Sequence, residues 1–149
     1  MSKKSNTEKF QQARQFLLQH RLDYDKAYHE FTWPEFDQFN WAREWFDVYA
    51  QNNQRTALWI KQDHGVDLKF SYADLSERSD RVAGWLQKLG VQRSDRIVLL
   101  LPNVVATWEL MLAAIKIGAV VIPTSTLATK DEVKDRIERS GAKFVVLDE

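Results

Sequence analysis

The second half of the chain alternates between two kinds of hydrophobic pattern. Apolar residues recur every three or four positions after Ser71, and a continuous apolar run then extends from Ile97 to Leu101. A helical period indicates an amphipathic helix, whereas a short continuous run is typical of a strand covered on both faces. The pattern predicts helices over 71–89, 104–117 and 129–140 and strands over 96–101, 119–122 and 143–147.

The order strand, helix, strand, helix, strand with short connections predicts an α/β fold. Successive βαβ units give a parallel βαβαβ sheet with right-handed crossovers, here of the flavodoxin-like type and part of a larger doubly wound domain. Asn103 is a candidate N-cap for the helix over 104–117. Proline ends strands and glycine ends helices, and the residues predicted to have these structural roles are Pro102, Gly118, Pro123 and Gly141.

The N-terminal third is rich in aromatic residues. A helix is predicted over 7–20, and more than half of the aromatic residues lie between Tyr24 and Tyr49. Such a cluster either stacks on nucleic-acid bases or anchors a covering segment to a core. The chain has 21 basic and 21 acidic residues, so it lacks the positive charge typical of nucleic-acid binding, and we favour the covering segment. Asn40 is a candidate N-cap for a further helix, with Trp41, Trp45 and Val48 on one face.

Two short strand-like runs over 56–61 and 66–70 come next. The polar segment 62–65 between them suits the turn of a β-hairpin. We therefore predict a helical covering segment over 1–52, followed over 53–149 by the hairpin and the first α/β subdomain.

Composition narrows the compartment and the partners. There are no cysteines, so disulfides, thiolate nucleophiles and cysteine metal sites are excluded, and a cytoplasmic location is expected. The first residues lack the apolar region of a secretory signal, and no apolar stretch reaches the length that crosses a bilayer. We expect no nucleic-acid partner and no membrane span.

The helix predicted over 104–117 is apolar on nearly every side. Its polar residues are Thr107, Glu109 and Lys116. A helix of this kind must be covered all round, whereas a three-stranded sheet covers one side. We expect the remainder of the same polypeptide or another chain to cover the rest, with self-association through the exposed apolar surface as one form of this. The chain also ends two residues after the last predicted strand, which we interpret as truncation.

Motifs predict no catalytic residue and no metal site. The five glycines are too dispersed for a phosphate-binding loop, no serine lies in a nucleophile elbow, and the three histidines lack metal-ligand spacing. One loop follows the carboxyl end of a parallel strand, where open α/β sheets place ligands. Its hydroxyls are candidates for contact with a phosphate or a pantetheine amide, and equally for turns and caps. This candidate substrate and CoA-side loop consists of Thr124, Ser125, Thr126 and Leu127.

The chain contains several motifs in a fixed order: FSYADL at 70–75, LPN at 101–103, AAIKIGAV at 113–120 and SGAK at 140–143. In this order they resemble the start of the adenylate-forming superfamily, which includes acyl-CoA synthetases, luciferases and peptide-synthetase adenylation domains. Upstream, FNWA at 39–42 and TALW at 56–59 look most like the medium-chain acyl-CoA synthetase branch.

The resemblance implies a two-step reaction for the longer enzyme. A carboxylate attacks the α-phosphate of ATP to give acyl-AMP and pyrophosphate, and the thiol of coenzyme A then displaces AMP; Mg²⁺ assists the first step. In the family the phosphate loop, the adenine-binding segments, the hinge and the adenylation lysine all follow this region. The chain is therefore expected to be inactive alone and to bind none of ATP, Mg²⁺ and CoA tightly. The family's Asn-Pro pair is replaced by Thr124-Ser125, and Leu127 stands where some members hold a polar residue near CoA.

The favoured hypothesis is the N-terminal part of an acid–thiol ligase of fatty acid metabolism. The full-length enzyme would activate a medium-chain fatty or related carboxylic acid, and its partners would be that substrate and the rest of the polypeptide. The alternative is a stand-alone α/β module that mediates interactions or binds a nucleotide or CoA without catalysis.

Overall fold

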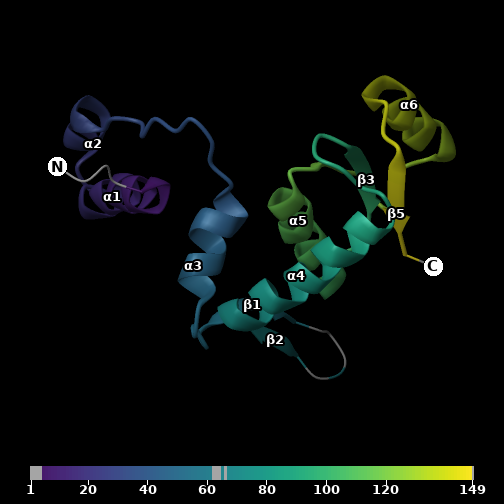
Figure 1. Cartoon of the computed structure of the whole chain (residues 1–149), viewed down its shortest axis with the longest axis horizontal. Coiled ribbons are helices and arrows are strands. Elements are labelled where there is room, and N and C mark those ends of the chain that lie inside the picture. Colours follow the sequence, from purple (N-terminus) through teal and green to yellow (C-terminus); the bar gives the residue numbers. More distant parts are fainter. Residues whose placement is uncertain (1–4, 62–64, 66, 149) are drawn as a thin grey trace.

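The computed structural model describes residues 5–61, 65 and 67–148 (Figure 1). The predicted hairpin turn, apart from Gly65, lies outside the described residues. The helices are α1 (Asn6–Gln19), α2 (Tyr24–Glu30), a π-helical turn (Ala42–Phe46), α3 (Asp47–Ala50), α4 (Tyr72–Lys88), α5 (Val105–Ile117) and α6 (Lys130–Ser140). The strands are β1 (Thr56–Ile60), β2 (Leu68–Ser71), β3 (Arg96–Leu100), β4 (Val120–Pro123) and β5 (Phe144–Leu147).

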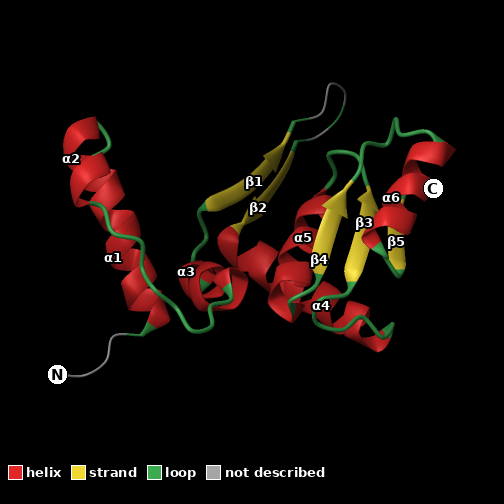
Figure 2. Cartoon of the chain, turned by 90° about the horizontal axis from the view of Figure 1, so that it is seen from above, coloured by secondary structure: helices red, strands yellow, loops and turns green. Residues whose placement is uncertain are grey.

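A three-stranded parallel sheet forms the centre of the second half (Figure 2). Its strand order is β4-β3-β5, and Ile97 of β3 pairs with Val121 on one side and Phe144 on the other. Val98 in the central strand is fully buried, as its continuous apolar run predicts. Strands β1 and β2 pair separately as an antiparallel hairpin. The predicted α/β fold class is confirmed.

Helices cover the sheet on both faces. Helices α4 and α5 pack on each other and on one face, where Leu86, Leu99 and Ala113 belong to one buried cluster. The connection through α6 runs from β4 past β3 to β5, so a right-handed crossover places α6 on the opposite face. Helices α1 and α2 contain no buried residue, and Figures 1 and 2 show them at the far end of the molecule from the sheet.

Helix ends follow the sequence signals closely, with one exception. Ser71 and Thr129 form complete capping boxes at the starts of α4 and α6. The prediction that Asn103 caps α5 is wrong: the N-cap residue is Val104, which makes no side-chain cap bond. The Asn103 carboxamide instead accepts from the indole N–H of Trp108 at 3.4 Å. Its oxygen therefore binds a side chain of the first turn of α5 and not a backbone N–H.

Asn40 directly precedes the helical stretch that starts at Trp41, and its side chain accepts from the backbone N–H of Arg43 at 3.1 Å, as predicted for a cap. The buried face differs from the one that the aromatic spacing indicates. Ala42, Phe46 and Ala50 are buried, whereas Trp41, Trp45 and Val48 lie at intermediate or exposed positions. Two alanines allow a close approach that two tryptophans would prevent, and the tryptophan side packs partly on α1, where Phe10 lies 5.0 Å from Trp45 between ring centroids.

The N-terminal segment is attached to the end of α5 by hydrogen bonds. The Asn40 carboxamide donates to the carbonyl of Ile115 at 2.8 Å, and the Arg43 guanidinium donates to the carbonyl of Lys116 at 2.8 Å. The last carbonyls of a helix have no partner within the helix and carry partial negative charge. A cationic side chain from far upstream therefore satisfies them and favours this docking.

The charged residues of α5 are buried, and several of its apolar residues are exposed. Glu109 is paired with Arg78 of α4. Lys116 has a fully buried side chain, and its ammonium lies 2.7 Å from Asp47, 2.9 Å from Asp80 and 3.0 Å from the Ser76 carbonyl oxygen. The exposed large apolar side chains on this helix are Trp108 and Ile115.

The expectation that α5 buries an apolar surface on all sides is thus wrong for one side. Its α4-facing side is held by charge pairs, which tolerate burial because each charge meets an opposite charge and hydrogen-bonding partners. In the described part of the chain, no helix combines the length and hydropathy needed to cross a bilayer.

Asp95 connects the starts of all three parallel strands. Its carboxylate accepts from the Lys143 ammonium at 2.7 Å and from the Gln92 backbone N–H at 2.9 Å, and its carbonyl accepts from the Val120 N–H at 2.8 Å. The bond from Lys143, followed by that from Gln92, lowers the pKa of Asp95 below its usual 3.8.

The Lys116→Met variant should lose about 1–3 kcal/mol of unfolding free energy. The substitution leaves Asp47 and Asp80 without their shared cation. Both carboxylates reach water, so the loss stays below the roughly 3–5 kcal/mol of a fully buried broken pair. Urea denaturation measures it. Lys134→Met, which removes an exposed pair with Glu138 at 3.8 Å, is the matched control and should cost under about 0.5 kcal/mol; equal losses would contradict the assignment.

The Asp95→Asn variant should make the free energy of unfolding depend less on pH in the acid range. A carboxyl with a lowered folded pKa stabilises the fold at pH values above its unfolded pKa, and this stabilisation is lost as pH falls through the folded pKa. The variant should therefore be less stable than the parent near pH 7 and approach it below about pH 3. Urea titrations across this range measure the difference, with the exposed residue change Asp148→Asn as control. A constant gap at all pH values would refute the linkage.

Candidate functional site

The carboxyl ends of the parallel strands meet at one edge of the sheet. Because β3 and β4 run parallel, the loops over 101–104 and 124–129 that follow them lie next to each other. The Thr124 N–H donates to the Leu99 carbonyl at 2.9 Å, which continues the ladder one residue beyond β4. This edge is where open α/β sheets bind ligands.

The candidate loop uses most of its hydroxyls internally. Thr124 is buried, and its hydroxyl donates to the Ile122 carbonyl at 3.3 Å. The Ser125 hydroxyl accepts from the Leu127 N–H at 3.1 Å, which forms a serine turn. Thr126 is exposed and, among the described residues, its side chain makes no hydrogen bond. Leu127 is 90% exposed. Three of the predicted four residues are thus exposed, Ser125, Thr126 and Leu127, and of the exposed hydroxyls only that of Thr126 makes no hydrogen bond among the described residues.

The first turn of α5, which follows the neighbouring loop, contains an exposed aromatic side chain. The Thr107 hydroxyl donates to the Pro102 carbonyl at 2.7 Å, which fixes the first turn of α5 against the loop. Trp108 on that turn is 43% exposed. The two loops contain hydroxyl, amide and apolar side chains and no titratable group, so this edge can bind through hydrogen bonds and stacking but cannot transfer a proton through a side chain.

The predicted structural residues lie at element boundaries. Pro102 follows β3, and Pro123 is the last residue of the edge strand β4, where a missing N–H disturbs the ladder least. Gly118 and Gly141 end α5 and α6 with φ of 73° and 64°. A Cβ on Gly118 would also lie 3.1 Å from Arg93 Cγ, so this position favours glycine for two reasons.

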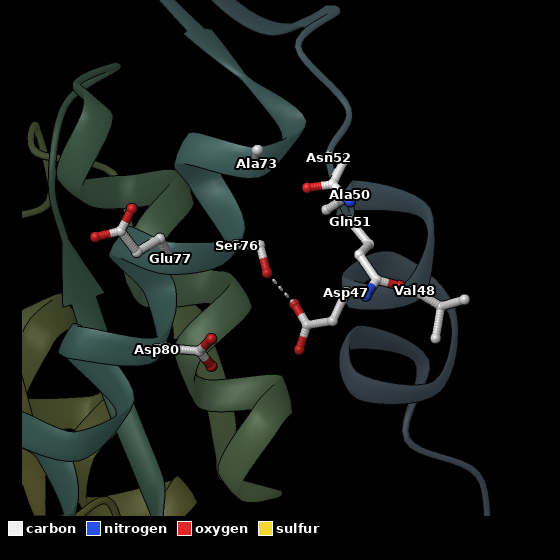
Figure 3. Close-up of a pocket in the computed structure, with 9 residues that line it drawn as sticks. All are labelled: Asp47, Val48, Ala50, Gln51, Asn52, Ala73, Ser76, Glu77 and Asp80. Carbon is white, nitrogen blue, oxygen red and sulfur yellow. Dashed lines mark hydrogen bonds between the residues drawn. The ribbon is translucent and has the colours of Figure 1, made fainter.

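A hollow of about 480 Å³ lies between α3 and α4 (Figure 3). Asp47 reaches from α3 toward Ser76 on α4, whose hydroxyl donates to its carboxylate at 2.6 Å, and Glu77 and Asp80 also line the hollow. The Lys116 ammonium supplies one positive charge against Asp47 and Asp80. Carboxylates at a rim repel phosphate, so this hollow does not suit a nucleotide. Among the described residues no group of three or more His, Cys, Asp or Glu could hold a metal ion.

The sequence indicates that the charged residues of α5 have charged partners. Glu109 and Lys116 are seven residues apart on an otherwise apolar helix, so they lie on the same face two turns apart. Such a pair indicates a buried face with charged partners on the neighbouring helix. The partners Asp47 and Asp80 are far apart in sequence and belong to no recognisable motif, so their pairing with Lys116 cannot be predicted from the sequence.

Comparison with known proteins places this arrangement in a family. The sequence model described as "AMP-binding enzyme" matches residues 45–149, more than half of the chain. Acetyl-coenzyme A synthetase of Bacillus subtilis is 35% identical over 83% of this chain and 24% of its own length. Human acyl-coenzyme A synthetase ACSM5, mitochondrial, is 30% identical over 76% of this chain and 20% of its own length. The chain thus spans about a quarter or less of the length of these relatives.

Solved structures agree with the sequence match. Klebsiella oxytoca NpsA in complex with 3-hydroxyanthranilyl-AMSN superposes with a TM-score of 0.67 and 25% identity, over 75% of this chain and 22% of NpsA. The N-terminal subdomain of the same protein gives a TM-score of 0.63 and 26% identity over 70% of this chain. The predicted resemblance to the adenylate-forming superfamily is confirmed. The chain belongs to the AMP-binding enzyme family and corresponds to an N-terminal portion of it.

Proposed function

We propose that the chain is the first part of the large N-terminal domain of an AMP-forming acyl-CoA synthetase. The observation that carries this proposal is the family match over residues 45–149 together with relatives named acetyl- and acyl-coenzyme A synthetases. The parallel sheet supports it, since its carboxyl edge is the kind of surface on which such folds bind ligands.

The proposed reaction activates a carboxylic acid in two displacements. A carboxylate oxygen attacks the α-phosphorus of ATP, and the bond to pyrophosphate breaks to give acyl-AMP. The sulfur of coenzyme A then attacks the acyl carbon, and AMP leaves with the bonding electrons. AMP is a far better leaving group than the oxygen of a free carboxylate, which is the chemical reason for spending ATP.

The contribution of this chain is to bind and position rather than to catalyse. Thr126 presents an exposed hydroxyl in the loop that follows β4, at the carboxyl edge of the sheet. We propose that Thr126 contacts the pantetheine part of CoA and that Leu127 offers it an apolar contact. The described residues contain no cluster of His, Cys, Asp or Glu suited to Mg²⁺, so we assign no ligand of this ion to this chain.

The N-terminal region is proposed to be a covering segment over 1–52, and residues 53–149 are proposed to be the first α/β subdomain. The bonds from Asn40 and Arg43 to the end of α5 support this division, because they attach the segment to the subdomain from outside. We propose that the exposed Trp108 and Ile115 of α5 are covered by the rest of the same polypeptide.

Substrate class and compartment are further proposals. A medium-chain fatty acid is proposed from the upstream motifs at 39–42 and 56–59. A cytoplasmic location is proposed from the lack of cysteines, although relatives include proteins named mitochondrial. Fractionation of cells that express the full-length protein distinguishes the two compartments.

The full-length protein should catalyse ATP–pyrophosphate exchange that depends on octanoate, and the 149-residue chain should not. Exchange reports acyl-AMP formation without CoA, so it tests the first displacement directly. Benzoate and acetate, assayed in parallel, define the acyl preference. Exchange by the 149-residue chain alone would refute the proposal that this chain does not catalyse. If the full-length protein showed no exchange with any acid tested, the proposed enzyme class would be refuted.

In the full-length protein, Thr126→Val should raise the KM for CoA about threefold to tenfold, the range of one lost hydrogen bond. The rate of octanoate-dependent exchange should stay unchanged, since CoA takes no part in it. Thr124→Val is the matched control, because its buried hydroxyl donates to the Ile122 carbonyl of β4 and its loss should lower the melting temperature instead. An unchanged KM for CoA in Thr126→Val would remove the proposed contact.

A further inference from the structure

The N-terminal arm, which runs from α1 to Asn40, contains an apolar groove. No residue of the parallel sheet lines this groove. One wall is α1, where Phe10 and Leu17 lie on one side, and the other wall is the extended segment that contains Trp33 and Phe36. Figure 2 shows this segment running beside α1. The groove encloses about 580 Å³, within the roughly 300–1,000 Å³ typical of small-molecule sites. Its residues all precede the family match, which starts at residue 45.

Contacts at several points along the groove hold the two walls together. Phe10 stacks on Phe39 with ring centroids 5.4 Å apart, and Phe16 meets Phe31 at 6.1 Å. The Lys9 ammonium donates to the Glu35 carbonyl at 2.9 Å. Because the extended wall is tied to α1 through both Phe31 and Phe39, the space between them is bounded by fixed aromatic side chains.

The chemistry of the lining selects a type of ligand. Every residue that lines the groove is apolar except Arg14. The guanidinium of Arg14 lies 5.5 Å from the ring centroid of Trp45, and among the described residues no acidic side chain forms an ion pair with it. A long apolar surface with one available cation at its side complements an alkyl chain that ends in an anion.

We propose that this groove binds a fatty acid, with its alkyl chain between α1 and the 31–39 segment and its carboxylate at Arg14. The identity of the ligand as a carboxylic acid rests on the proposed function, whereas its amphiphilic character rests on the lining alone. Each additional methylene that enters the groove strengthens binding by up to about fourfold, so dodecanoate binds more tightly than octanoate.

Photolabelling of the full-length protein tests this site directly. The probe is a dodecanoate that carries a terminal aliphatic diazirine, which on irradiation loses nitrogen and inserts into a nearby bond. Peptide mapping by mass spectrometry should find label within residues 10–39, and unlabelled dodecanoate should compete better than octanoate. No label in this range would overturn the proposal, as would equal labelling by the corresponding alcohol, which lacks the anion.

Two pairs of variants separate recognition from surface hydrophobicity. Arg14→Gln should reduce labelling within 10–39 about threefold to tenfold, and Arg21→Gln, an exposed change on the same arm outside the groove, should not. Leu17→Gln should reduce it, whereas Leu22→Gln, at a 94% exposed position outside the lining, should not. Equal effects within either pair would overturn the proposal.

Two further outcomes are distinguishable. A dimer in light scattering whose formation protects 31–39 from the probe would mean that a second copy fills the groove, which overturns the fatty-acid assignment. Label within 10–39 in a protein that shows no acid-dependent pyrophosphate exchange would support the groove while removing the proposed ligase function.

Discussion

The buried ammonium of Lys116 sets the geometry on which the rest of this structure depends. An unpaired charge at such a position would be prohibitively costly, so Asp47 from α3 and Asp80 from α4 must both reach it. Three helices separated in sequence are thereby fixed at one point. The apolar faces of α4 and α5 set how closely the helices pack, and the charge cluster sets how they are aligned.

The position of α5 relates the candidate ligand edge to the N-terminal segment. This helix leads out of the carboxyl edge at Thr107 and Trp108, and it ends at the carbonyls that Asn40 and Arg43 bind. One rigid element therefore connects the candidate ligand edge at its start with the N-terminal segment at its end. The loop with Thr126 lies beside the start of this helix because β3 and β4 are paired in parallel register.

Local signals in the sequence predicted the fold well, whereas contacts between residues distant in sequence could not be predicted from it. Capping boxes at Ser71 and Thr129 and the apolar run of β3 act within one element, so each can be identified from a short stretch. The partners of Lys116 come from elements up to 69 residues away in sequence, and no spacing rule reports them. The burial of Ala42 and Ala50 could likewise not be predicted. Aromatic residues dominate that stretch, and the advantage of a small residue depends on how closely the neighbouring helix packs.

The bond between Asn40 and Ile115 spans 75 residues, which bears on the order in which the chain folds. Contacts within a βαβ unit close short loops, whereas this one must wait for a long loop to close at a higher entropic cost. The α/β unit should consequently form first, and its helix carbonyls should stay hydrated until the N-terminal arm arrives. During synthesis the arm leaves the ribosome before the α/β unit does, so its aromatic surface should spend an interval without the surface to which it finally attaches.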